Sequence, residues 1–137
     1  YVDINRLSNN SFKKQVEGSD FFVETRTVDS FNLNMINFIK IDVEGFEKDV
    51  IDGAMHSILT FKPILMIEIY PKFANYDVKK LFKLFFDLNY QVLYNIRGKG
   101  LQQIKNASDG ERIANSHKNG LLHDYDFLFL PESIKWP

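Results

Sequence analysis

The sequence predicts an α/β fold with a mostly parallel sheet, and three observations carry that prediction. Short apolar segments rich in β-branched and aromatic residues alternate with longer segments in which apolar residues recur every three to four positions. The apolar segments end at polar residues, glycine or proline, as strands do where they meet a turn. Strands that alternate with helices of about ten residues or more indicate crossover connections, which join parallel strands.

Length and composition predict one folded domain, because 137 residues are enough for a single core. Hydrophobic residues make up 45% of the chain and charged residues 26%, which indicates a packed interior rather than disorder. The 13 Phe residues lie within periodic apolar segments, so we expect them in the core rather than on an aromatic binding surface.

Charge and cysteine content exclude several classes of function. With 17 basic and 18 acidic residues and no basic stripe, nucleic-acid binding has no electrostatic support. The absence of cysteine excludes disulfides and thiolate metal sites, and it is compatible with a cytoplasmic location. No signal peptide is visible, and no apolar run approaches the roughly 18 residues that a membrane span needs.

The first third of the chain is predicted to be irregular apart from one strand. Residues 1–20 are polar and are expected to form a loop, residues 21–28 (FFVETRTV) a strand, and Asp29 a turn. The chain begins with Tyr1 instead of Met, so we expect a processed, excised or incomplete product.

Two strand–helix units are predicted next. Residues 36–43 (INFIKIDV) form a short strand, and apolar residues spaced by four positions predict a helix over 46–59. Residues 64–70 (ILMIEIY) form the second strand, and Asp77 is the expected N-cap of a helix over 78–88.

The last third is predicted to contain two strands and one long loop. Residues 90–96 (YQVLYNI) and 125–130 (YDFLFL) have the composition of strands. Residues 97–120 are polar and contain four glycines, which predicts a loop. Because loops of this length are usually functional or disordered, we expect this one to help select a substrate.

The candidate site begins at the end of the strand over residues 36–43. Because side chains alternate along a strand, Lys40, Asp42 and Glu44 are expected on one face, with Lys40 and Asp42 about 6.6 Å apart and able to pair. Ligands of open α/β sheets bind at the carboxyl ends of strands, where Asp42 and Glu44 fall. The alternative is an edge strand whose polar face meets water.

A second carboxylate favours a ligand site over a solvent-facing edge strand. Glu68 lies near the end of the following strand, within an otherwise apolar run, where a buried carboxylate needs a partner or a function. If the two strands are parallel neighbours, Asp42 and Glu68 share one edge of the sheet. His56, His117 and His123 have no spacing typical of a metal site, and we expect no metal. No helix signal follows the glycines around Lys99, so a phosphate loop is not predicted there.

The run FIKIDVEGFEKDVIDGA, followed by KPILMIEIYP, resembles the central signature of the FkbM-type S-adenosylmethionine-dependent methyltransferases. The preceding TVDSF and the closing DYDFLFLP resemble flanking segments of that family, so the resemblance covers about residues 24–131. It implies a partial class I methyltransferase fold, Rossmann-like and three-layered, with a mostly parallel sheet whose last strand is antiparallel. By that mapping, residues 1–137 are the C-terminal part of one domain whose N-terminal strands are missing.

The resemblance also implies residue roles. The family's reaction is methyl transfer from S-adenosylmethionine to a hydroxyl of a sugar or other small metabolite. By the same resemblance, Asp42 is expected near the methionine end of the cofactor. Glu44 and Glu68 then line the acceptor side, as base or hydrogen-bonding groups, in an order that the sequence leaves open. The strands that hold the adenine and ribose in the family have no counterpart here, so we expect weak cofactor binding by this chain alone.

The sequence leaves two other functions open. One is a non-catalytic α/β binding or assembly module derived from a methyltransferase. The other is a metal-dependent hydrolase with Asp42, Glu44 and Glu68 as oxygen ligands, which the lack of a spaced ligand motif argues against. The acceptor and the oligomeric state are not predicted.

Overall fold

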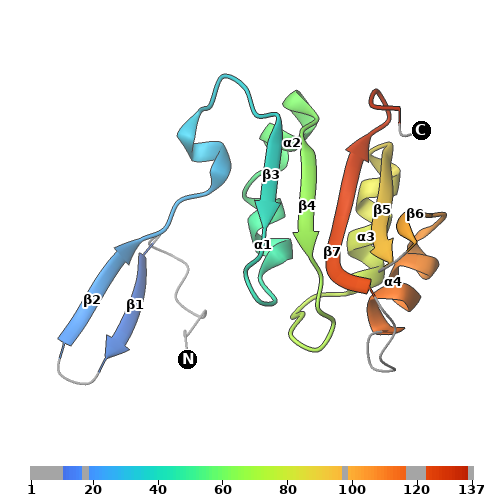
Figure 1. Cartoon of the computed structure of the whole chain (residues 1–137). Coiled ribbons are helices and arrows are strands. Elements are labelled where there is room, and N and C mark those ends of the chain that lie inside the picture. Colours follow the sequence, from blue (N-terminus) through green and yellow to red (C-terminus); the bar gives the residue numbers. More distant parts are fainter. Residues whose placement is uncertain (1–10, 17–18, 97–98, 117–122, 136–137) are drawn as a thin grey trace.

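A computed structural model describes residues 11–16, 19–96, 99–116 and 123–135 (Figure 1). Its main feature is a five-stranded sheet with the strand order β3-β4-β7-β5-β6. In chain order these strands are β3 (Phe38–Ile41), β4 (Ile64–Glu68), β5 (Tyr90–Ile96), β6 (Gly100–Ile104) and β7 (His123–Pro131). The helices are α1 (Glu47–Asp52), α2 (Met55–Phe61), α3 (Val78–Asp87) and α4 (Ala107–Asn115).

The strand directions make the sheet mixed. β3 and β4 are adjacent and parallel, and α1 and α2 connect them, which confirms the predicted crossover unit. β7 runs antiparallel to both of its neighbours, β4 and β5, and β6 is antiparallel to β5. Three of the five strands therefore share one direction, but only one neighbouring pair is parallel, because β7 lies between β4 and β5.

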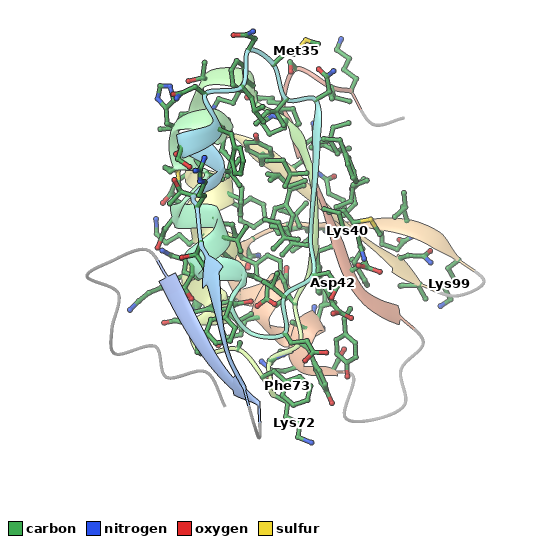
Figure 2. The ribbon with its side chains drawn as sticks, turned by 90° about the vertical axis from the view of Figure 1, so that its left-hand side faces the viewer. Met35, Lys40, Asp42, Lys72, Phe73 and Lys99 are labelled. Carbon is green, nitrogen blue, oxygen red and sulfur yellow. The ribbon has the colours of Figure 1, made fainter. Side chains whose placement is uncertain are left out.

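The helices in the described part of the chain lie on one face of the sheet (Figures 1 and 2). The expected third layer is therefore not present among these residues, which form two layers. α4 adds to the helical layer instead of covering the other face, because its Gly110 packs directly on the ring of Phe82 in α3. None of the helices in the described ranges is long and apolar enough to span a membrane.

Four phenylalanines are the largest fully buried side chains of the core, between the sheet and the helical layer. Phe82 and Phe85 of α3 are fully buried against Phe127 and Phe129 of β7. The ring centroids of Phe82 and Phe127 lie 5.2 Å apart, and those of Phe85 and Phe129 4.5 Å apart. The predicted use of Phe as core filler is confirmed for these residues, although other Phe side chains, among them Phe73, are exposed.

The N-terminal part differs from the prediction. Residues 11–16 form β1 (Ser11–Val16), which pairs with β2 (Ser19–Glu24) as an antiparallel hairpin, so the predicted loop over 1–20 is wrong for that stretch. β2 stops before residue 25 and pairs with no strand of the five-stranded sheet. The short 3-10 helix η2 (Val28–Phe31) follows, because the hydroxyl of Thr27 accepts a hydrogen bond from the Ser30 N–H.

The helix predicted over residues 46–59 is divided at Gly53 into α1 and α2. A Cβ at Gly53 would lie 3.2 Å from the side chain of Thr27, and the Gly53 carbonyl accepts a hydrogen bond from the Asp29 N–H. The carboxylate of Asp29 accepts hydrogen bonds from the backbone N–H groups of His56 and Ser57 and from the Ser57 hydroxyl. The helix breaks because a distant segment supplies partners for the start of α2.

The long loop predicted over residues 97–120 is also wrong, since it contains β6 and α4. β6 pairs with β5 in a hairpin, and Gly100 at its start has a φ of 71°. α4 begins after Asn106, whose side chain accepts a hydrogen bond from the Asp109 N–H. Gly110 is a site of close helix packing on α3 instead of a loop signal, and the role of this segment in substrate selection stays a prediction.

Candidate active site at the carboxyl ends of β3 and β4

Asp42 and Glu68 meet at one edge of the sheet. β3 ends at Ile41, directly before Asp42, and β4 ends at Glu68. Because the strands are parallel neighbours in register, both carboxylates lie at the strand ends where α/β sheets bind ligands. The two carboxyls are neighbours that shift each other's pKa, and the Lys40 ammonium donates to the Asp42 carboxylate at 2.8 Å (Figure 2).

A third carboxylate belongs to the same edge. Asp126 of β7 is the register partner of Glu68, and its charge acts on both Glu68 and Lys40. The sequence analysis missed this residue, because nothing local indicates that β7 inserts beside β4. Its alternation with the buried Phe127 places Asp126 on the uncovered face, but only the strand order brings it next to Glu68.

The surroundings shift the pKa values of Asp42 and Glu68 in opposite directions. The hydrogen bond from Lys40, followed by that with Glu68, holds the pKa of Asp42 below its ordinary value. Burial raises the pKa of Glu68, and the hydrogen bond and charge of Asp42 and the charge of Asp126 raise it further. Asp42 is therefore the group of the pair that stays ionised, whereas Glu68 holds a proton more readily.

Glu44 does not share this arrangement. The strand ends at Ile41, so the alternation of faces expected for Lys40, Asp42 and Glu44 does not extend to Glu44. Glu44 lies in a turn with a φ of 48°, and its side chain is exposed. The structure thus brings two of the three candidate residues together and leaves Glu44 at the entrance to the turn.

The turn after Asp42 is fastened to the segment that follows β4. Gly45 has a φ of 101°, and a Cβ there would lie 2.1 Å from the Phe73 carbonyl oxygen, so only glycine fits. Glu47 is 2% exposed, and its carboxylate accepts hydrogen bonds from the Gly45 N–H at 2.8 Å and the Tyr76 hydroxyl at 2.7 Å. The sequence analysis missed these contacts, because Tyr76 is 29 positions away from Glu47.

Aromatic side chains border the carboxylates. The ring centroids of Tyr70 and Tyr125 lie 4.2 Å apart, and Phe73 meets Tyr70 edge-on at 4.9 Å. Burial and a hydrogen bond with Tyr70 raise the pKa of Tyr125 to about 12, so this phenol stays neutral at ordinary pH. Phe73 is half exposed beside the rim, which is the edge of the sheet that carries Asp42 and Glu68 (Figure 2). The edge therefore offers carboxylates, phenol hydroxyls and an apolar ring to a ligand.

No metal centre is evident in the described ranges, where no group of three or more His, Asp or Glu side chains could hold an ion. His56 is exposed on α2, whereas His117 and the side chain of His123 fall outside the described residues. Lys99 lies before β6, apart from Asp42 in Figure 2, and Gly98 beside it is not among the described residues.

A hollow of about 600 Å³ lies at the other end of the sheet. Its lining includes Tyr90, the first residue of β5, and Ile104, the last residue of β6. Because β5 runs in the same direction as β3 and β4, this hollow is at the amino ends of those strands. The carboxylate pair and this hollow therefore occupy opposite edges, and the chemistry favours the carboxylate edge.

Together these features define an α/β domain with a carboxylate-lined edge at the carboxyl ends of its parallel strands. The model of the FkbM methyltransferase domain matches residues 2–92, and the chain belongs to that family. β6, α4 and β7 lie beyond the matched residues, although β7 pairs with β4 inside the same sheet. No curated protein and no solved structure matches the chain.

Proposed function

We propose that this chain takes part in S-adenosylmethionine-dependent methyl transfer to a hydroxyl of a sugar, glycan or other small metabolite. The observation that carries the proposal is the placement of Asp42 and Glu68 side by side at the carboxyl ends of β3 and β4, within the segment matched by the methyltransferase family. Methyl transfer depends mainly on the alignment of donor and acceptor, so a rigid rim with few reactive groups is suited to it.

Asp42 is the residue proposed to face the cofactor. S-adenosylmethionine, when bound, supplies an electrophilic methyl group on a positively charged sulfonium. The hydrogen bond from Lys40 keeps the pKa of Asp42 low, so Asp42 carries a negative charge that can stabilise a cation in its neighbourhood. The donor set of the rim, carboxylates and phenols without thiols or clustered histidines, fits an organic cation.

Glu68 is the proposed base for the acceptor hydroxyl, and the structure supports it over Glu44. In its ionised form, Glu68 would accept the proton of the acceptor hydroxyl while the hydroxyl oxygen takes the methyl group, whose bond to the sulfonium sulfur breaks. A raised pKa makes Glu68 a stronger base than an ordinary glutamate, which suits proton transfer near neutral pH. The exposed Glu44 is proposed to form acceptor hydrogen bonds instead.

We further propose that residues 1–137 are the C-terminal part of one methyltransferase domain, active within a longer protein. β3 has no partner on its outer side among the described residues, and the sheet face opposite the helices has no helical cover there. By resemblance, the adenine and ribose contacts come from strands that precede this region. The complete cofactor site would then form only when those strands join β3.

Titration calorimetry of the 137-residue chain with S-adenosylmethionine tests this division. We expect no saturable binding in the micromolar range, while a longer protein that contains the chain binds the cofactor and methylates its acceptor. Micromolar binding at one site of the chain alone would overturn the proposed division. A longer protein that transfers no methyl group to any hydroxyl would overturn the proposed activity.

A non-catalytic assembly module is the second candidate, and a surface feature favours it. Exposed apolar side chains lie just before and within the free edge strand β3, namely Phe31, Leu33, Met35 and Phe38. Unpaired strand edges beside apolar surface promote association. Sedimentation velocity of the chain distinguishes the candidates, because a stable stoichiometric oligomer without cofactor binding favours the module.

A further inference from the structure

Three contacts join the turn at residues 43–46 to the segment at residues 70–77. The Asn75 N–H donates to the Gly45 carbonyl at 3.4 Å, and the Gly45 α-carbon lies against the Phe73 carbonyl. The third contact runs through the buried Glu47, which holds the Gly45 N–H with one carboxylate oxygen and the Tyr76 hydroxyl with the other. These contacts connect the loop after β3, which begins at Asp42, with the loop after β4, which begins directly after Glu68.

We propose that Glu47 and Tyr76 are positioning residues, which fasten these two loops together and thereby hold Asp42 and Glu68 side by side at the strand ends. The proposal rests on the function proposed above for Asp42 and Glu68, and it adds the residues that act through them. Neither Glu47 nor Tyr76 is placed at the substrate.

Burial makes this link hard to replace. Glu47 is almost fully buried, and a carboxylate in that position is retained only when hydrogen bonds replace those from water. Its partners are one backbone N–H and one hydroxyl, so removal of the Tyr76 hydroxyl leaves half of the carboxylate without a donor. We expect the turn to shift away from the segment that follows β4, which would lengthen the contact between Asp42 and Glu68.

Carboxyl titrations of the 137-residue chain, followed by carbon-13 nuclear magnetic resonance, test the proposal without any cofactor. The variant is Tyr76→Phe, and the matched control is Tyr90→Phe. Tyr90 is a buried tyrosine whose pKa is raised, as is that of the partly buried Tyr76, but the Tyr90 hydroxyl donates to the Pro63 carbonyl at the opposite edge of the sheet. Both variants lose one hydrogen-bonded tyrosine hydroxyl, so a difference between them reports on the edge that carries Asp42 and Glu68.

The expected result is specific to Tyr76→Phe. The pKa of Glu68 should fall toward its ordinary value of 4.5 and that of Asp42 should rise toward 3.8, because the shared hydrogen bond weakens. Lys40 and Asp126, the other charged groups that face the pair, remain in both variants. In Tyr90→Phe both titrations should match the wild type.

A second pair of variants tests the same link from Glu47. Glu47→Gln keeps an acceptor oxygen and should retain most of the wild-type titration, whereas Glu47→Ala should behave like Tyr76→Phe. In a longer active protein, Tyr76→Phe should lower kcat by about 10- to 100-fold with a smaller change in KM, as expected for misplaced groups.

Unchanged titrations of Asp42 and Glu68 in Tyr76→Phe would overturn the proposal. Unfolding of Tyr76→Phe, with Tyr90→Phe still folded, would also overturn it, because the hydroxyl would then serve stability alone. If the titrations respond as expected but a longer protein transfers no methyl group, the proposed function fails and the positioning role stands.

Discussion

The two faces of the five-stranded sheet use the same strands for different purposes. On the face toward the helices, one register row crosses every strand as Ile39, Leu65, Phe129, Val92 and Ile104, and all but Ile39 are buried. One residue further along, the row on the other face is Lys40, Met66, Leu128, Leu93 and Gln103. This second row is charged or polar at both of its ends and apolar in the middle.

The two faces differ in whether they can hold charged side chains. The helix-covered face is packed by apolar groups and supplies stability, so it has little room for charge. The uncovered face and its carboxyl edge hold Lys40, Asp42, Glu68 and Asp126, where charges keep some contact with water. Function is therefore expected at the edge where the uncovered face meets the strand ends, and the predictions below test that separation.

The largest expected effect is a loss of core packing. Phe129→Ala, on the covered face, should lower the free energy of unfolding by about 3–5 kcal/mol, because it leaves a cavity among fully buried rings. Leu128→Ala, the next residue on β7 but on the uncovered face, should cost about 1 kcal/mol. Urea unfolding measures both variants, and equal losses would show that the uncovered face is packed as tightly as the other.

Asp42→Asn tests the functional edge. In an active longer protein it should lower kcat by about 100-fold, the size expected when a positioned charge is lost, with little change in stability. The control is Asp52→Asn, which also breaks an exposed ion pair with a lysine, Lys48, but on helix α1. Steady-state kinetics and thermal unfolding measure the two effects. Wild-type turnover of Asp42→Asn would remove the catalytic role of this residue.

Gly45→Ala tests the close contact that supports the rim. The added Cβ would meet the Phe73 carbonyl in a backbone conformation that other residues avoid, so we expect a loss of about 2–3 kcal/mol. Gly100→Ala also has a positive φ but no atom within 4 Å, and it should cost only about 1 kcal/mol. Denaturant unfolding gives both values, and similar losses would show that the contact with Phe73 contributes nothing.

The smallest expected effect is the pH dependence that Glu68 adds to stability. Its pKa is raised above 4.5 in the folded chain, so the folded state holds the proton at higher pH than the unfolded state does. Ionisation of Glu68 therefore reduces stability as the pH rises through the interval above 4.5.

Glu68→Gln should remove this loss. The variant should match the wild type at about pH 4 and become relatively more stable toward about pH 7, since only the wild type ionises there. Glu132→Gln, at an exposed position after β7, is the control and should show no such trend. If Glu68→Gln becomes less stable relative to the wild type as the pH rises, the pKa of Glu68 is lowered in the folded chain instead.

The sequence by itself determined the local elements whose signals are contained within one segment. The strand over 90–96 has the predicted bounds, and Asp77 caps α3 by accepting a hydrogen bond from the Lys80 N–H, as predicted. The strand–helix–strand order also placed Asp42 and Glu68 at one edge of the sheet, because parallel neighbours end on the same side. Periodicity and capping depend on near neighbours along the chain, so they can be read from the sequence.

Only the tertiary structure decided the features that join distant segments. Asp29 divides the helix near Gly53, Asp126 comes beside Glu68 through the placement of β7, and Glu47 finds Tyr76 in another loop. The chemistry of a polar residue indicates which kinds of group it can bond, but the sequence does not show which distant residue the fold brings next to it. The loop predicted over residues 97–120 is wrong for the same reason, since Gly110 allows a close approach between two helices that no local pattern reveals.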